Sequence, residues 1–141
     1  MYYKFRLKKE KFESTWTLRP KIKVTLSHKE KTKDVIAILD TGSDLNYIPI
    51  ELAEYFELLL SEETFTVQGA EQEFEYRTAK LFVKLEHPHK SYRKILSFMI
   101  PVKTIIIKEI ILGTEFLKDF TVTFDYQNET IKLIEKQKIK K

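Results

Sequence analysis

The chain has 141 residues, of which 43% are hydrophobic and 13% aromatic, enough to bury the core of one globular domain. It has no Cys, which excludes disulfides, thiolate metal sites and a Cys nucleophile, and its three Gly stand too far apart for a phosphate-binding loop, a dinucleotide fingerprint or a G-x-S-x-G nucleophile elbow. The 25 Lys and Arg only slightly exceed the 21 Asp and Glu, for a formal net charge of +4.

Targeting signals are not evident. The basic residues near the start are not followed by an apolar stretch of the length that a signal peptide needs. The most apolar stretch, residues 95–112, contains Pro101 and several charged residues, so it does not predict a membrane span. We therefore expect a soluble cytoplasmic protein that contacts no membrane. Absent Cys and abundant Lys, Glu and Ile resemble the composition of thermophile proteins.

Short runs rich in β-branched and aromatic residues, separated by polar turns, predict an all-β fold. Residues 1–19 form an N-terminal extension that could add a strand or a dimer contact. Within it, Trp16 is expected to pack in the core or in an interface, because a large ring flanked by Thr suits a strand.

Two strands are expected next. Residues 21–26 alternate between polar and apolar, which predicts a half-buried strand. Its apolar face consists of Ile22, Val24 and Leu26. The short apolar run 35–39 predicts a strand that is buried on both faces and that leads directly into Asp40.

The middle of the chain predicts one helix and a hairpin. Residues 49–59 place Pro49 in a first helical turn. The apolar positions at helical spacing in this segment are Leu52, Phe56 and Leu59. Residues 65–68 and 73–85 read as the two arms of a β-hairpin around Gly69. Phe74 and Tyr76 suit packing on the face of that hairpin.

Further strands and a second short helix are expected in the last third of the chain. Strands are expected at 94–100, 104–107, 121–126 and 130–134. Thr114 is expected to cap a short helix over 114–119 that buries Phe116 and Leu117. The last residues, 135–141, form a basic tail for which we expect exposure to solvent rather than contact with nucleic acid.

Asp40 is the residue that carries chemistry. It leaves a buried strand and enters a tight loop with Thr41, Gly42 and Ser43, where an ionised carboxylate needs hydrogen-bond donors. Those donors are the Thr and Ser hydroxyls and the loop N–H groups. By itself, Asp-Thr-Gly is equally consistent with an ordinary turn after a strand.

The segment ILDTGSDLNYI resembles the active-site signature of the aspartic proteases, and the chain as a whole resembles the single-domain retropepsins over residues 20–134. Two further elements occur in the order and spacing of that family. One is the I-L-G segment Ile111, Leu112 and Gly113, which packs across the active-site loop in retropepsins. The other is the hairpin at Gln68, Gly69 and Ala70, where a retropepsin carries its flap.

The resemblance implies a retropepsin-like closed barrel and an aspartic endopeptidase. Only one Asp-Thr-Gly is present, whereas the reaction uses two carboxylates, one as base and one as acid. A symmetric homodimer would supply Asp40 twice. By the same resemblance, Thr41 holds the two loops together, Gly42 approaches carboxylate and substrate, and Ser43 donates to the Asp40 carboxylate.

The expected partners are therefore a second copy of the chain and an extended peptide or protein substrate, with no nucleic acid, no cofactor and no metal. His87 and His89 flank a Pro, which favours an exposed turn over a metal pair because no third ligand is nearby. Two alternatives remain open: a retropepsin-fold module that binds peptides or dimerises without cutting, and a basic β-barrel that binds nucleic acid. The sequence does not indicate the cleavage specificity.

Overall fold

The computed structural model describes residues 2–69, 71–103 and 108–137. This part of the chain contains twelve strands and two short helices. The strands are β1 (Tyr2–Arg6), β2 (Lys8–Phe12), β3 (Thr15–Arg19), β4 (Lys21–His28), β5 (Lys31–Leu39), β6 (Asn46–Tyr47), β7 (Phe65–Gln68), β8 (Glu73–Leu85), β9 (Tyr92–Pro101), β10 (Ile110–Leu112), β11 (Phe120–Asp125) and β12 (Thr130–Glu135). The helices are α1 (Ile50–Tyr55) and α2 (Thr114–Leu117).

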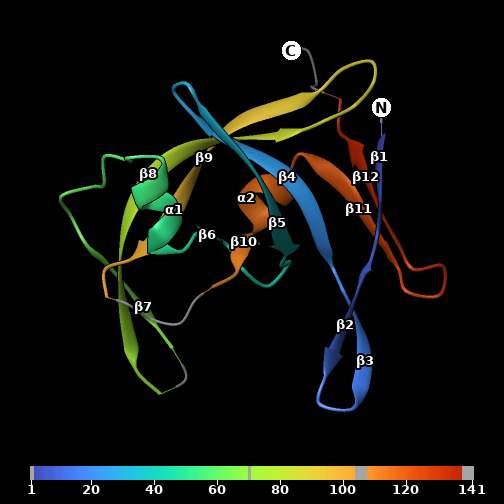
Figure 1. Ribbon diagram of the computed structural model, residues 1–141, viewed down its shortest axis with the longest axis horizontal. Coiled ribbons are helices and arrows are strands. Elements are labelled where there is room, and N and C mark those ends of the chain that lie inside the picture. Colours follow the sequence, from blue (N-terminus) through green and yellow to red (C-terminus); the bar gives the residue numbers. More distant parts are fainter. Residues whose placement is uncertain (1, 70, 104–107, 138–141) are drawn as a thin grey trace.

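A closed barrel forms the body of the molecule (Figure 1). Its sheet has the order β4-β5-β10-β6-β9-β8-β7, and a further pairing of β4 with β8 closes the first six of these strands into a ring. Two pairs, β5 with β10 and β6 with β9, are parallel, and the others are antiparallel. The predicted all-β closed barrel is confirmed.

Alternating apolar residues of the barrel strands point inward and make the core. The face predicted for β4 is confirmed, since Ile22, Val24 and Leu26 are almost fully buried. The long strands β8 and β9 contribute the same alternation, because side chains of successive residues point to opposite faces of a sheet. Their most buried core residues are Leu81, Val83, Leu85, Leu96, Phe98 and Ile100.

A separate three-stranded sheet, in the order β1-β12-β11, packs beside the barrel. The N-terminal strand β1 pairs antiparallel with β12, with Tyr3 opposite Leu133. The Tyr3 ring contacts the Phe120 ring edge-on, with centroids 6.3 Å apart. The predicted final hairpin is confirmed as β11 and β12, and the N-terminal extension contributes the third strand.

The prediction that residues 35–39 are buried on both faces is wrong. In β5, Ala37 and Leu39 are buried, whereas Ile36 is 47% exposed. The strand has β4 on one side and β10 on the other, so its edges are covered, but its outer face belongs to the barrel surface. The apolar run 35–39 therefore forms a barrel strand that is buried on its inner face only, rather than a strand that is buried on both faces.

Helix α1 is shorter than predicted. Pro49 precedes the helix as its N-cap residue instead of occupying the first turn. The helix ends at Tyr55, and Glu57 has a positive φ of 52°, with which a right-handed helix cannot continue. Leu52 and Phe56 are buried as expected, but Leu59 lies beyond the helix and is 92% exposed.

Helix α2 begins differently from the prediction. The N-cap residue is Gly113 rather than Thr114, and no side-chain hydrogen bond caps the helix. Phe116 and Leu117 are buried as predicted. Strand β9 covers the strand expected at 94–100, whereas residues 104–107 lie outside the described residues. Neither helix in the described ranges is long and apolar enough to cross a membrane.

Trp16 is not part of the core. It lies on the two-stranded hairpin of β2 and β3, which forms a sheet of its own, and it is 66% exposed. The hairpin has too few strands to build an apolar interior around the ring.

Candidate active site

The loop after β5 holds the candidate catalytic carboxylate. Asp40 is half-buried, and its backbone N–H donates to the carbonyl of Leu112 at 3.0 Å, so the strand pairing of β5 with β10 extends to this residue. The N–H of Gly42 donates to Oδ1 of Asp40 at 2.9 Å. This hydrogen bond fixes the orientation of the carboxylate.

The I-L-G segment lies directly against this loop. Strand β10 runs parallel to β5, with Leu112 opposite Leu39. The N–H of Thr114 then donates to the carbonyl of Ser43 at 2.8 Å. The two segments, which are about seventy residues apart in the chain, therefore form one unit.

Gly113 is the point of closest approach between the two segments. A Cβ added at this position would lie 2.4 Å from the carbonyl oxygen of Ser43 and 2.5 Å from that of Leu45. These contacts are to backbone, which cannot rotate away, so a residue with a side chain does not fit. At Gly42 the space is less restricted, because an added Cβ would lie 3.3 Å from Oδ1 of Asp40.

Asn46 is a residue that the sequence reasoning missed. It is 1% exposed and is the only fully buried polar side chain among the described residues. Its Oδ1 accepts from the N–H of Gly113 at 2.8 Å, and its Nδ2 donates to the carbonyl of Ser97 at 3.0 Å. The signal was available: a polar residue inside the apolar segment after the loop is costly unless both halves of its amide are bonded.

Ser43 makes a different hydrogen bond from the one implied by the resemblance. Its Oγ donates to the carbonyl of Leu45 at 2.7 Å, not to the carboxylate of Asp40. In the single chain the hydroxyl therefore tightens the loop. Thr41 is exposed at the same loop.

The residues expected to form a flap lie at the end of the β7–β8 hairpin, which projects from the barrel (Figure 1). The N–H of Gly69 donates to the carbonyl of Gln72 at 2.8 Å, and Nε2 of Gln68 donates to the carbonyl of Gly69 at 3.2 Å. A Cβ at Gly69 would lie 2.5 Å from the ring of Phe74. Phe74 therefore packs on its own hairpin, as predicted. Ala70 lies outside the described residues.

Two tyrosines connect the active-site loop to the base of the flap hairpin. Tyr47 follows the loop on β6, Tyr76 lies on β8, and their rings meet edge-on with centroids 5.4 Å apart. Burial raises the pKa of both phenols, and the charge of Asp44 raises the pKa of Tyr47 further. Both phenols therefore stay neutral, and the two rings present an uncharged surface next to the loop.

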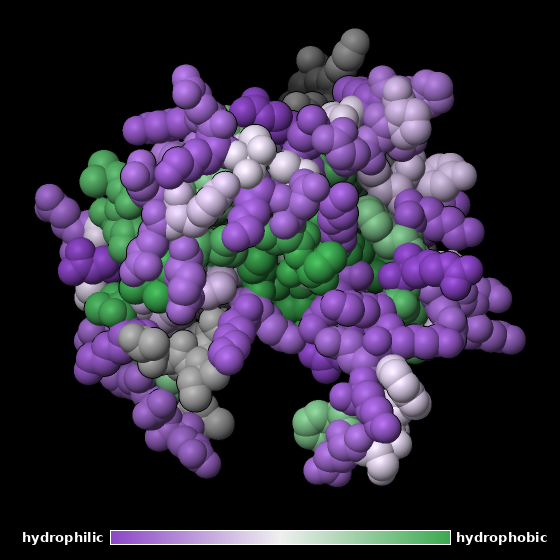
Figure 2. Space-filling model, in the orientation of Figure 1, coloured by the Kyte–Doolittle hydropathy of each residue, from purple (hydrophilic) through white to green (hydrophobic). Residues whose placement is uncertain are grey.

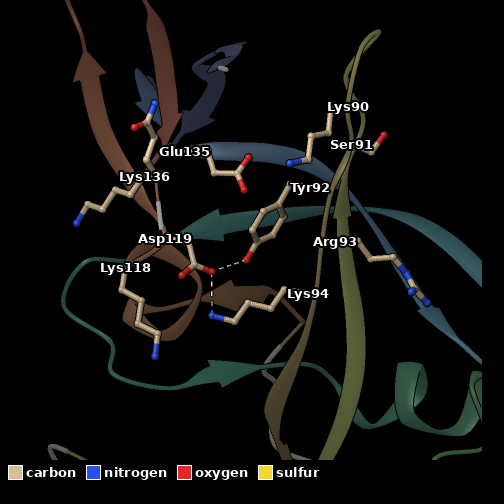
Figure 3. Close-up of a pocket in the computed structure, with 10 residues that line it drawn as sticks. Lys90, Ser91, Tyr92, Arg93, Lys94, Lys118, Asp119, Glu135 and Lys136 are labelled. Atoms are coloured by element: carbon tan, nitrogen blue, oxygen red, sulfur yellow. Dashed lines mark hydrogen bonds and ion pairs between the residues drawn. The ribbon is translucent and has the colours of Figure 1, made fainter. Parts of the chain in front are cut away.

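A separate cavity of about 890 Å³ lies on another part of the molecule (Figure 3). It is lined by Lys90, Ser91, Tyr92, Arg93, Lys94, Lys118, Asp119, Glu135, Lys136 and Gln137. The Tyr92 hydroxyl and the Lys94 ammonium both donate to Oδ2 of Asp119 at 2.8 Å. None of the predicted site residues lines this cavity, so it is not the candidate active site.

A comparison with solved structures shows the fold. No protein-family model matches the sequence, and no match was found among curated proteins. The structure is similar to the crystal structure of a retropepsin-like aspartic protease from Rickettsia conorii, with a TM-score of 0.60, 12% identity and coverage of 94% of this chain and 91% of that chain. It is also similar to EIAV protease in complex with an inhibitor, with a TM-score of 0.48, 16% identity and coverage of 72% and 86%. The chain has the retropepsin fold.

Proposed function

We propose that the protein is an aspartic endopeptidase that works as a homodimer, in which Asp40 of each subunit supplies one carboxylate. The observation that carries this proposal is the position of Asp40. It directly follows strand β5 of a retropepsin fold. Its carboxylate accepts from the N–H of Gly42, and its own N–H donates to the carbonyl of Leu112, next to Gly113.

The chemistry needs two carboxylates in different protonation states. The ionised carboxylate takes a proton from a water molecule, whose oxygen attacks the carbonyl carbon of the peptide bond. The protonated carboxylate donates its proton to the carbonyl oxygen. The proton taken from water then moves to the amide nitrogen, and one hydroxyl of the tetrahedral intermediate returns its proton to the other carboxylate as the C–N bond breaks, which releases a carboxylic acid and an amine. Two carboxyl groups that lie side by side cannot both be ionised, because their negative charges repel, so the pair shares one proton.

One chain carries only half of such a pair, because the sequence has a single Asp-Thr-Gly. A two-fold axis beside the loop would bring the second Asp40 into place. The hydrogen bonds that Asp40 accepts from the N–H of Gly42 and donates to the carbonyl of Leu112 hold the loop in one geometry before the partner arrives. Such preorganisation lowers the cost of assembling the site.

The proposed substrate is an unfolded or extended segment of a protein. Such a segment can add as a strand between the active-site loop and the β7–β8 hairpin, with alternate side chains entering pockets. In this arrangement Gln68 and Gly69 close over the peptide and exclude water. The neutral rings of Tyr47 and Tyr76 lie beside the loop, where they would favour an apolar side chain of the substrate.

A cleavage assay with denatured proteins tests the proposal. Wild-type protein, Asp40→Asn and Asp44→Asn are incubated with denatured proteins of diverse sequence at acidic pH, and fragments are identified by mass spectrometry. Asp44 is the matched control, an exposed carboxylate in the same loop. We expect Asp40→Asn to fold and to lose cleavage by at least about 10³-fold, while Asp44→Asn keeps it. Equal cleavage by Asp40→Asn would refute the proposal, and a folded wild type without cleavage would indicate a binding module.

A further inference from the structure

No residue of strands β2 and β3 is buried; each is exposed or half-buried. The five residue pairs of the β2–β3 hairpin run from Lys8 opposite Arg19 to Phe12 opposite Thr15, and no third strand joins them. Phe12 is 72% exposed and Trp16 is 66% exposed. Figure 2 shows the hairpin as a projecting lobe with hydrophobic surface near its tip. Large exposed aromatic residues on such a lobe are typical of an interaction site.

The hairpin starts beside the catalytic loop. Strand β3 continues through Pro20 into β4, and the N–H of Leu39 donates to the carbonyl of Pro20 at 2.8 Å. Lys21 pairs with Ile38 in the antiparallel β4–β5 ladder. The hairpin therefore continues the line of β4 past the end of β5, toward the side on which Asp40 leaves the strand (Figure 1). Five residues of strand extend roughly 17 Å.

Ion pairs at the base hold the hairpin in this direction. The Lys21 ammonium, with a side chain only 11% exposed, lies 2.8 Å from Glu10 and 3.0 Å from Glu109. On the other side, Lys9 lies 3.4 Å from the carboxylate of Glu129. The N–H of Leu7 also donates to the carbonyl of Glu129 at 2.9 Å. The hairpin is therefore fixed to β4 through Lys21 and to the turn at Glu129, whereas no ion pair is found at the aromatic tip among the described residues.

We propose that the β2–β3 hairpin is an arm that packs against a second copy of this chain. This inference rests on the proposed function, in which the second copy must approach the face of Asp40. A rigid arm that projects past that face enters the space of the approaching copy. Because a two-fold contact is reciprocal, each arm packs against the other subunit, and the dimer contains the same arm contact twice.

The exposed aromatic residues fit a protein partner of this kind. Phe12 and Trp16 belong to neighbouring pairs of the hairpin and lie on opposite faces. The arm is thus apolar on both sides near its tip, which suits insertion between surfaces of the partner. Trp16 and Leu18 also line a hollow of about 550 Å³ against Glu129, large enough to receive a side chain. Buried aromatic anchors dominate the free energy of many interfaces.

Trp16 is the only Trp of the chain, so its fluorescence reports on the arm alone. The Asp40→Asn protein, which cannot degrade itself, is measured across a concentration series by sedimentation and by Trp emission. We expect the emission maximum to shift to shorter wavelength over the same range in which dimers form. In the same background, Phe12→Ala and Trp16→Ala should each raise the dimer dissociation constant at least about 10-fold. Leu59→Ala, at an apolar residue that is 92% exposed elsewhere, should leave it unchanged.

The outcomes separate this inference from the proposed function. A dimer with unchanged Trp emission and unchanged dissociation constants in both arm variants would overturn the role of the arm, while wild-type cleavage would still support the peptidase. A chain that stays monomeric and cleaves nothing would contradict both. Circular dichroism of the arm variants checks that the barrel is intact.

Discussion

The backbone N–H of Gly113 donates to the side-chain Oδ1 of Asn46 at 2.8 Å, in the buried layer under the active-site loop. Through this bond, the residue six positions after Asp40 fixes the segment that approaches the loop most closely. The other half of the Asn46 amide is bonded to the carbonyl of Ser97 on β9. One side chain thus connects β6, β9 and the residue that follows β10, close to the loop that holds the candidate catalytic residue.

Replacing Asn46 should therefore destabilise the fold. Asn46→Leu keeps the approximate volume but leaves the N–H of Gly113 and the carbonyl of Ser97 without their partner. Buried unsatisfied groups cost about 1–3 kcal/mol each, so we expect a loss of about 2–5 kcal/mol in the free energy of unfolding. Denaturant unfolding should show a lower midpoint at a similar slope. Gln137→Ala, at an exposed residue, serves as the control, and equal stability of both variants would contradict the bridging role.

Gly113 and Gly42 should differ in their response to a methyl group. At Gly113 the new Cβ meets two backbone carbonyls at 2.4 and 2.5 Å, which forces the loop and β10 apart. We expect Gly113→Ala to lose about 1–3 kcal/mol or more, as other overpacked sites do. At Gly42 the nearest atom is Oδ1 of Asp40 at 3.3 Å, so Gly42→Ala should affect cleavage far more than stability. Thermal unfolding and the cleavage assay together distinguish the two; the opposite ranking in stability would be inconsistent with the geometry.

The pocket that contains Asp119 predicts a loss of stability in acid. Burial would raise the pKa of this carboxyl, but the hydrogen bonds from Lys94 and Tyr92 outweigh burial and hold the pKa below its ordinary value. A group whose pKa is lowered on folding stabilises the protein above the unfolded value, about 3.9, and the contribution disappears as pH falls through the lower folded value. Asp119→Asn should be less stable than wild type at pH 7, and the difference should shrink below about pH 4.

Unfolding free energies of both proteins at neutral pH and near pH 2 measure this effect. Asp44→Asn is the control, because Asp44 is exposed. A difference between wild type and Asp119→Asn that stays constant over this range would show that the carboxylate does not couple folding to protons.

The rate of cleavage should have a maximum on the acidic side of neutral. Two carboxylates that share one proton lose activity when both are protonated and again when both are ionised, which gives a bell-shaped profile. The profile of kcat/KM for a single peptide substrate reports the titration of the free enzyme. A maximum above pH 8 would rule out a shared-proton mechanism.

Much of the fold follows from the sequence for a definite reason. Strand alternation, as in Ile22, Val24 and Leu26, depends on local burial and is visible in the residues themselves. The order of Asp40, Gly69 and Gly113 along the chain also indicates the topology. At Gly69 the ring of Phe74 leaves no room for a side chain, and at Gly113 the backbone of the active-site loop leaves none.

The errors share a physical cause as well. The exposure of Ile36 depends on which strands become neighbours, and an apolar run does not contain that information. Leu59 continued the helical spacing, but the positive φ of Glu57 had already ended the helix. Asn46 was missed because its role depends on contacts with Ser97 and Gly113, far away in sequence. Trp16 is not in the core, because its hairpin pairs with no third strand, and the interface that was also expected stays a prediction.

A subunit-mixing experiment tests the central claim most directly. Wild-type protein is held at a fixed concentration above its dimer dissociation constant, and folded Asp40→Asn protein is added in increasing amounts before cleavage is measured. If each site uses Asp40 from both subunits, mixed dimers are inactive. Cleavage should then fall to about half at equal amounts and approach zero in excess variant. Cleavage that stays constant at every ratio would show that one chain carries a complete site, and would contradict the account.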